Sequence, residues 1–127
     1  MRLLDTDVCV DIRRRYAPAI QWLAALPEAP GLPGFVLLEL MQGVRNQREM
    51  ARLLGDVAPF RIHWPTAADC ARAVQTYARA HLTHRVGILD LVIGECAVGL
   101  NATLCTFNIR HFRAIPALAT EQPYRRN

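Results

Sequence analysis

The order of strand-like and helix-like segments constrains the fold of this chain more than any other feature of its sequence. Short apolar or alternating segments predict strands at residues 2–4, 60–65 and 102–107, with a last edge strand at 117–123. Segments with helical character separate them, at residues 8–15, 18–26, 46–54, 66–82 and 87–100. Because strands that alternate with helices are typical of crossover connections, we expect an α/β fold with a mainly parallel sheet.

The middle of the chain is harder to assign. Residues 27–34, "PEAPGLPG", are rich in proline and glycine and predict a loop. In residues 35–44 the first positions favour a strand, and the Leu, Glu, Met and Gln that follow favour a helix, which places Glu39 in its first turns. We expect Gly55 to end the next helix and Thr66 to cap the one after it.

Length and composition indicate one globular domain, residues 1–127. A chain of 127 residues builds one sizeable core and is too short for two ordinary domains. Its 52% hydrophobic and 20% charged residues exclude a disordered chain. No apolar run is long enough to span a membrane, and Asp5 and Asp7 interrupt the region where a signal peptide is apolar, so we expect a cytoplasmic protein. The four cysteines form no CxxC pair and are expected to be buried free thiols.

The charged residues are compatible with a nucleic-acid partner. The formal net charge is +4, and all fifteen basic residues are arginine. The guanidinium group binds phosphate with two parallel hydrogen bonds, which the ammonium group of lysine does not do. A basic chain of this kind is consistent with an anionic polymer as substrate, although charge alone does not identify it.

Carboxylates follow apolar residues at three separate places, in "LLDT" (Asp5), "LLEL" (Glu39) and "ILDL" (Asp90), and Asn108 follows the last predicted buried strand. The carboxyl ends of parallel strands meet at one edge of a sheet, so these four side chains are expected to lie together. Acids that gather in apolar surroundings repel one another and favour a cation. Oxygen ligands of this type suit Mg²⁺ or Mn²⁺.

Each acid also has an ordinary structural explanation. Asp5 and Asp7 are both good N-caps for the helix that follows the first strand. Asp90 is favoured near a helix N-terminus by the helix dipole, and Glu39 alone is typical of a solvated helix position. His111 is expected to pack rather than to act. Only the set of four polar residues raises the metal hypothesis above these alternatives.

At these residues the sequence resembles the PIN-domain ribonucleases, in particular the VapC-type toxins of bacterial toxin–antitoxin pairs. "LLDTDV" is similar to the opening strand and first acid of the family, although Asp7 stands where the family usually has Asn. "LLELMQG" is similar to the segment of the second acid, and "VGILDLVIGECA" to that of the third. "LCTFNIRHF" resembles the closing strand and its Thr-x-Asn-x-x-His-Phe element. The match runs through the chain in the family's order.

The resemblance implies a three-layer α/β/α sandwich and assigns roles to single residues. Asp5, Glu39 and Asp90 become metal ligands and, with Asn108, catalytic residues. Asn108 stands where many relatives have a fourth acid, which weakens the case for a second metal ion. We expect further side chains to contact either the metal ligands or the substrate, namely Thr6, Asp7, Thr106 and Arg110.

The implied function is an endoribonuclease, dependent on Mg²⁺ or Mn²⁺, that inhibits translation by cutting RNA. The family also implies a homodimer and a small cognate antitoxin that blocks the active site. We expect the RNA backbone to contact arginines near the site, namely Arg13, Arg45, Arg48, Arg110 and Arg113. Apolar residues of the segment 17–54, including Trp22, Leu26 and Met41, predict a groove for the antitoxin.

Two other functions stay open from the sequence. With Asn108 in place of an acid, the chain is also consistent with a weakened PIN-like module that binds RNA or antitoxin without cleavage. "DTDVC" also resembles the Asp-x-Asp motif of haloacid-dehalogenase-like phosphatases, in which Asp5 would be a nucleophile. That family uses a basic residue, normally lysine, beside the phosphate; this chain has no lysine and is short for the fold.

Overall fold

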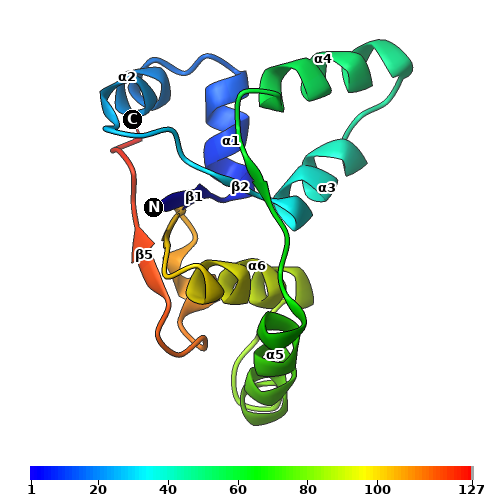
Figure 1. The fold of residues 1–127 in the computed structure, drawn as a ribbon, viewed down its shortest axis with the longest axis vertical. Coiled ribbons are helices and arrows are strands. Elements are labelled where there is room, and N and C mark those ends of the chain that lie inside the picture. Colours follow the sequence, from blue (N-terminus) through cyan, green and yellow to red (C-terminus); the bar gives the residue numbers. More distant parts are fainter. Residues whose placement is uncertain (127) are drawn as a thin grey trace.

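A parallel sheet forms the centre of the molecule. The computed structural model describes residues 1–126, and its first sheet pairs β1 (Arg2–Leu4), β4 (Thr103–Cys105) and β5 (Ala119–Glu121) in the order β1-β4-β5. Both pairings are parallel, with Leu3 opposite Leu104 and Leu104 opposite Thr120. Strands from both ends of the chain therefore lie in the same sheet, on either side of β4, as Figure 1 shows. The expected parallel arrangement is confirmed.

Two shorter strands extend the sheet on the other side of β1. β2 (Leu32–Pro33) and β3 (Ile62–His63) pair in parallel. Gly31, just before β2, accepts a hydrogen bond from the Leu4 N–H (3.0 Å) and donates one to the Arg2 carbonyl (2.8 Å). A Cβ at Gly31 would lie 2.6 Å from Cδ2 of His63 and 2.9 Å from Cδ2 of Leu3, so this close approach requires glycine.

Helices cover the sheet on both sides. Figure 1 shows α1 (Thr6–Arg13) and α2 (Ala17–Ala25) on one side of β1, and α5 (Ala67–Ala80) and α6 (Ile88–Gly99) on the other. α3 (Gly34–Gln42) and α4 (Gln47–Val57) lie beside α1, and a 3-10 helix, η1 (Ile109–Phe112), follows β4. The α/β class expected from the sequence is correct.

The core lies where the strands meet these helices. Its completely buried side chains come from β1, β2, β4 and the faces of α1, α3 and α6, and they include Leu3, Leu4, Val8, Leu32, Val36, Ile93 and Leu104. Such residues place the ends of β1 and β4 next to each other. Within residues 1–126, no helix is both long and apolar enough to cross a membrane.

Several expected boundaries are wrong. α4 continues past Gly55 to Val57, because Leu53 and Val57 lie one turn apart on its buried face and outweigh the local preference of glycine. α3 begins at Gly34, so residues 35–37 form no strand and Glu39 lies in the middle of the helix. The predicted loop 27–34 contains β2. Of the four thiols, Cys70 is exposed rather than buried.

Candidate active site

Asp5 lies between β1 and α1, at the edge of the sheet formed by the carboxyl ends of β1 and β4, which we call the rim. Its backbone N–H continues the β1–β4 ladder by donating to the Cys105 carbonyl at 3.0 Å. Its carboxylate caps α1, with Oδ1 accepting from the Thr6 N–H at 2.9 Å. The other oxygen, Oδ2, accepts from the hydroxyl of Thr106 at 2.7 Å. Asp5 is therefore the N-cap and also a buried acid, only 5% exposed, held from two sides.

Asp7 connects α1 to the segment that follows β4. Its Oδ1 accepts from the Val8 N–H at 2.8 Å. Its Oδ2 accepts from the Phe107 N–H at 2.9 Å and from Nδ2 of Asn108 at 3.3 Å. The Asn108 N–H in turn donates to the Thr106 hydroxyl at 3.0 Å. These bonds place the amide of Asn108 beside the carboxylate of Asp7.

Glu39 and Asp90 approach from two further helices. The Thr6 hydroxyl donates to Oε1 of Glu39 at 2.9 Å, which joins α3 to the first turn of α1. Asp90 is in the first turn of α6, and its Oδ2 lies 3.5 Å from Nδ1 of His111. The His111 side chain is 61% exposed, so the expectation that it packs in the interior is wrong: η1 presents it to the acid.

The electrostatics show that the acids influence one another. The pKa of Asp5 is raised to about 6, chiefly by burial and also by the charges of Asp7 and Asp90, while the hydrogen bonds from Thr106 and Thr6 oppose the shift. Burial also raises the pKa of Asp90, with His111 opposing and Asp7 reinforcing the shift. The rim thus carries negative charge that the protein only partly compensates.

The donor set fits a divalent cation by its chemistry. Carboxylates at one rim, with a raised pKa caused in part by their mutual repulsion, are the groups that a hard cation stabilises. Asp5, Glu39 and Asp90 would hold such an ion. Within residues 1–126, no three His, Cys, Asp or Glu side chains converge closely enough to form a preformed metal cage. The described side chains thus form a gathering of acids held by hydrogen bonds.

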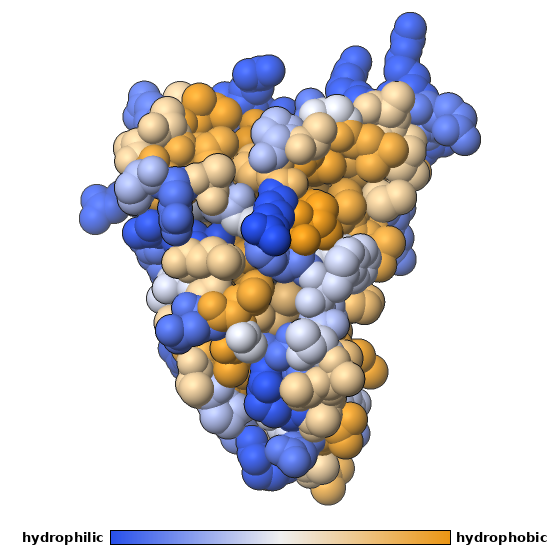
Figure 2. Space-filling model, in the orientation of Figure 1, coloured by the Kyte–Doolittle hydropathy of each residue, from blue (hydrophilic) through white to orange (hydrophobic). Residues whose placement is uncertain are grey.

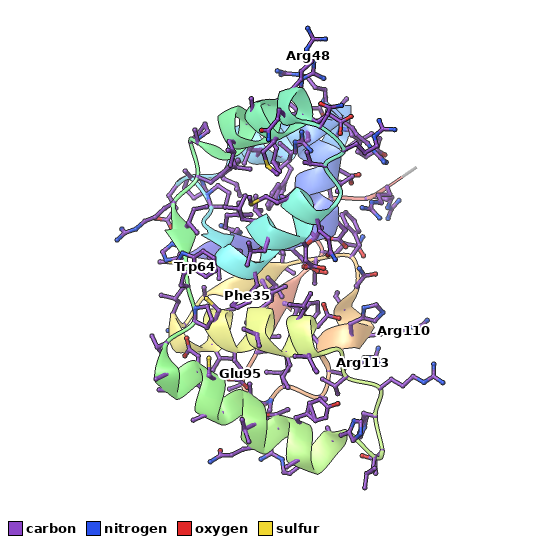
Figure 3. All side chains as sticks on the ribbon, turned by 90° about the vertical axis from the view of Figure 1, so that its right-hand side faces the viewer. Phe35, Arg48, Trp64, Glu95, Arg110 and Arg113 are labelled. Atoms are coloured by element: carbon purple, nitrogen blue, oxygen red, sulfur yellow. The ribbon has the colours of Figure 1, made fainter. Side chains whose placement is uncertain are left out.

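The remaining predicted residues divide into two groups. Thr106 is completely buried, and its hydroxyl donates to Asp5. Arg110 is exposed on η1, and Figure 3 shows it on the same side of the molecule as Arg113. Arg13 and Arg45 are paired with Asp56 and Glu49. Figure 3 shows Arg48 pointing away from the body of the protein.

The sequence analysis missed the C-terminal segment. The Tyr124 hydroxyl donates to Oδ2 of Asp11 at 2.6 Å, and Nε of Arg126 donates to the same oxygen at 3.1 Å. The Arg126 guanidinium lies 3.9 Å from the ring centre of Phe107 and donates to the Asp7 carbonyl at 3.5 Å. The segment therefore contacts both α1 and the residue that follows Thr106. A terminal "PYRR" has no pattern that predicts such contacts.

Comparisons with known proteins identify the family of the chain. The family model for the PIN domain matches residues 2–118. Ribonuclease VapC19 of Mycobacterium tuberculosis is 33% identical over 130 residues, covering 98% of this chain and all of that protein.

Solved structures show the same fold. The chain resembles VapBC2 from Rickettsia felis bound to a promoter DNA fragment, with a TM-score of 0.82, 23% identity and coverage of 94% of this chain and 96% of that one. It also resembles FitAcB from Neisseria gonorrhoeae, with a TM-score of 0.80, 25% identity and coverage of 97% and 98%. From the family match and the full-length relative, the chain belongs to the PIN domain family and, within it, to the VapC-type proteins.

Proposed function

We propose that this chain is the toxin of a toxin–antitoxin pair and an endoribonuclease that depends on Mg²⁺ or Mn²⁺. The observation that carries this proposal is the closeness of Asp7 and Asp90 to Asp5, whose pKa is raised to about 6, with Glu39 joined to the same turn through the Thr6 hydroxyl. The curated relative is named a ribonuclease, and neighbouring structures are toxin–antitoxin complexes, which supports the same assignment here. RNA as substrate places the activity in the cytoplasm.

The chemistry divides between the ion and the protein. When bound, a divalent cation makes water a better nucleophile at neutral pH and stabilises charge on the phosphoryl oxygens. The protein holds the acids in place: the Thr106 hydroxyl orients Asp5, and the Thr6 hydroxyl orients Glu39. The exposed imidazole of His111, beside Asp90, is able to donate a hydrogen bond to the phosphodiester.

The antitoxin is proposed to occupy a cleft between α1, α2 and α4. This cleft has a volume of about 840 Å³ and an apolar lining that includes Ile12, Ile20, Leu23, Leu26 and Phe60. In Figure 2 apolar residues reach the surface between α2 and α4, below projecting hydrophilic side chains. Of the groove residues predicted from the sequence, Leu26 lines the cleft, whereas Trp22 and Met41 pack on the core. An amphipathic helix is the occupant that such a cleft fits.

The test of the enzyme is cleavage of total RNA by the purified chain with Mg²⁺, with Mn²⁺ and with EDTA. We expect metal-dependent cleavage, with a rate that Asp90→Asn lowers by about 100-fold or more. Losing a residue that only hydrogen-bonds a metal ligand already costs up to about that much, and Asp90 is proposed as a ligand. Glu28→Gln, which removes an exposed acid that belongs neither to the acid rim nor to an RNA contact, is the matched control. Cleavage that survives Asp90→Asn would contradict the site. RNA binding without cleavage under either metal would favour the binding-only module.

A further inference from the structure

A second cleft begins at the acid rim and runs between α1, α3 and α4. It has a volume of about 520 Å³, within the range of roughly 300–1,000 Å³ that is usual for small-ligand pockets. Thr6 and Glu39 line one end of it. Whatever occupies this cleft therefore lies against Glu39, one of the three side chains that are proposed to hold the cation. That position suggests a part of the substrate adjoining the reacting phosphate.

The floor of the cleft is apolar and has a gap in it. Val10, Leu40 and Val44 line it together with Gly43. Gly43 has φ −82° and ψ −3°, a conformation that any residue adopts, and a Cβ there would meet nothing nearer than the Leu40 carbonyl oxygen at 3.7 Å. The backbone thus gives no reason for glycine at this position. The missing side chain instead leaves room in the cleft.

The charges around the cleft leave two arginines available. The carboxylate of Asp56 is paired with Arg13 at 3.1 Å, and that of Glu49 with Arg45 at 3.1 Å. Within residues 1–126, Arg14 and Arg52 make no ion pair with a carboxylate, although Arg52 lies near enough to Glu49 to lower its pKa. An apolar floor beside free guanidinium groups complements a flat base that carries a phosphate.

We propose that this cleft binds the nucleotide adjoining the cleaved phosphodiester of the RNA. The base lies on Val10, Leu40 and Val44 in the space above Gly43, and Arg14 and Arg52 contact the phosphate of that nucleotide. The inference rests on the proposed ribonuclease function and names the part of the substrate that the site holds. It makes the cleft a binding site and gives no catalytic role to its arginines.

The test fills the cleft without replacing any of the acids. In steady-state cleavage of a short single-stranded RNA, Gly43→Leu is expected to raise KM about tenfold and to change kcat by less than about twofold, since it removes binding and not chemistry. Gly43→Ala should give a smaller rise in KM, graded with side-chain size. Circular dichroism melting curves check that both variants fold.

The charge of the cleft is tested by binding. Fluorescence anisotropy of a labelled RNA on the Asp90→Asn background, in Mg²⁺, measures Kd at several salt concentrations. Arg14→Gln is expected to make the slope of log Kd against log salt shallower by about one. Arg79→Gln, an exposed arginine on α5 at the other end of the molecule, is the matched control.

Each result decides the proposal separately from the enzyme assignment. The proposal is overturned if Gly43→Leu changes neither the RNA affinity nor KM, or if the salt slope of Arg14→Gln equals that of Arg79→Gln. The cleft would then be assigned to a protein partner. If the wild type cleaves no RNA with either metal, the proposed ribonuclease function fails. In that case the anisotropy measurements on the Gly43 and Arg14 variants still decide whether the cleft binds RNA.

Discussion

At the scale of the residue, Asp5 is subject to opposing effects on the ionisation of its carboxylate. Its carboxylate caps α1 and accepts from Thr106, which favours the ionised form. Its burial and the charges of Asp7 and Asp90 disfavour that form, and the balance raises its pKa to about 6 from an ordinary 3.8. The folded state therefore binds a proton at a pH where the unfolded state has lost it. This costs stability at neutral pH in the absence of a cation.

We expect Asp5→Asn to be more stable than the wild type in EDTA at pH 7.5, by at most about 3 kcal/mol. Because a raised carboxyl pKa gives stability that is present below pH 4 and lost as the pH rises through 6, the difference should shrink toward pH 4. Urea unfolding at several pH values measures it, with the exposed Glu28→Gln as control. Mg²⁺ should stabilise the wild type and not the variant. A difference that is independent of pH would contradict the assignment.

At the scale of the element, α5 and α6 are held together by a buried charge network. Thr66 and Asp69 form a reciprocal capping box at the start of α5. Arg72, one turn further, binds both Asp69 and Glu95 of α6. Figure 3 shows Glu95 between the two helices, and both acids are almost completely buried. This network fixes α6, and with α6 the position of Asp90.

We expect Arg72→Met to lower the free energy of unfolding by about 3 kcal/mol, because it leaves the Asp69 and Glu95 carboxylates buried without their cation. Denaturant unfolding followed by circular dichroism measures the change. Arg79→Met on the same helix should change it by less than about 0.5 kcal/mol, since Arg79 is exposed. Adding Glu95→Gln to Arg72→Met should recover part of the loss. An Arg72 variant as stable as the control would contradict this role.

The elements also show what the sequence predicts and what it does not. β1, β4 and α6 are predictable because their apolar runs are strong and their ends carry clear signals. The end of α4 is not, because the local cost of Gly55 is overruled by the burial of Val57, which depends on tertiary packing. The sequence predicts Asp5 and Asn108 just after strands and Glu39 and Asp90 near the starts of helices, which indicates that they share one edge of the sheet. The contact of His111 with Asp90 and the contacts of Arg126 depend on how η1 and the C-terminal segment fold back.

At the scale of the whole molecule, several large apolar side chains face solvent. Trp64, Val74 and Ile88 are more than half exposed, and they come from the segment after β3, from α5 and from the start of α6. We propose that the homodimer expected from the family resemblance buries these side chains. Arg48, which projects from the molecule at α4, lies on a different element from these three apolar residues.

We expect the wild type to sediment as a dimer and Val74→Arg to sediment as a monomer, because a charge on this exposed face of α5 would be buried without a partner. Sedimentation velocity at several protein concentrations measures this. Leu54→Arg, at an exposed position on α4, serves as the control and should leave the dimer intact. A wild type that is monomeric at all concentrations would exclude the dimer.

The pairing of β1 with β4 also sets when the site is assembled during synthesis. Asp5 leaves the ribosome before the hydroxyl that orients it, that of Thr106, which follows 101 residues later. A chain still being translated lacks the strand that pairs with β1, and Asp5 then has no fixed orientation. For a nuclease whose substrate is RNA, this order would keep the unfinished chain inactive beside the message that encodes it.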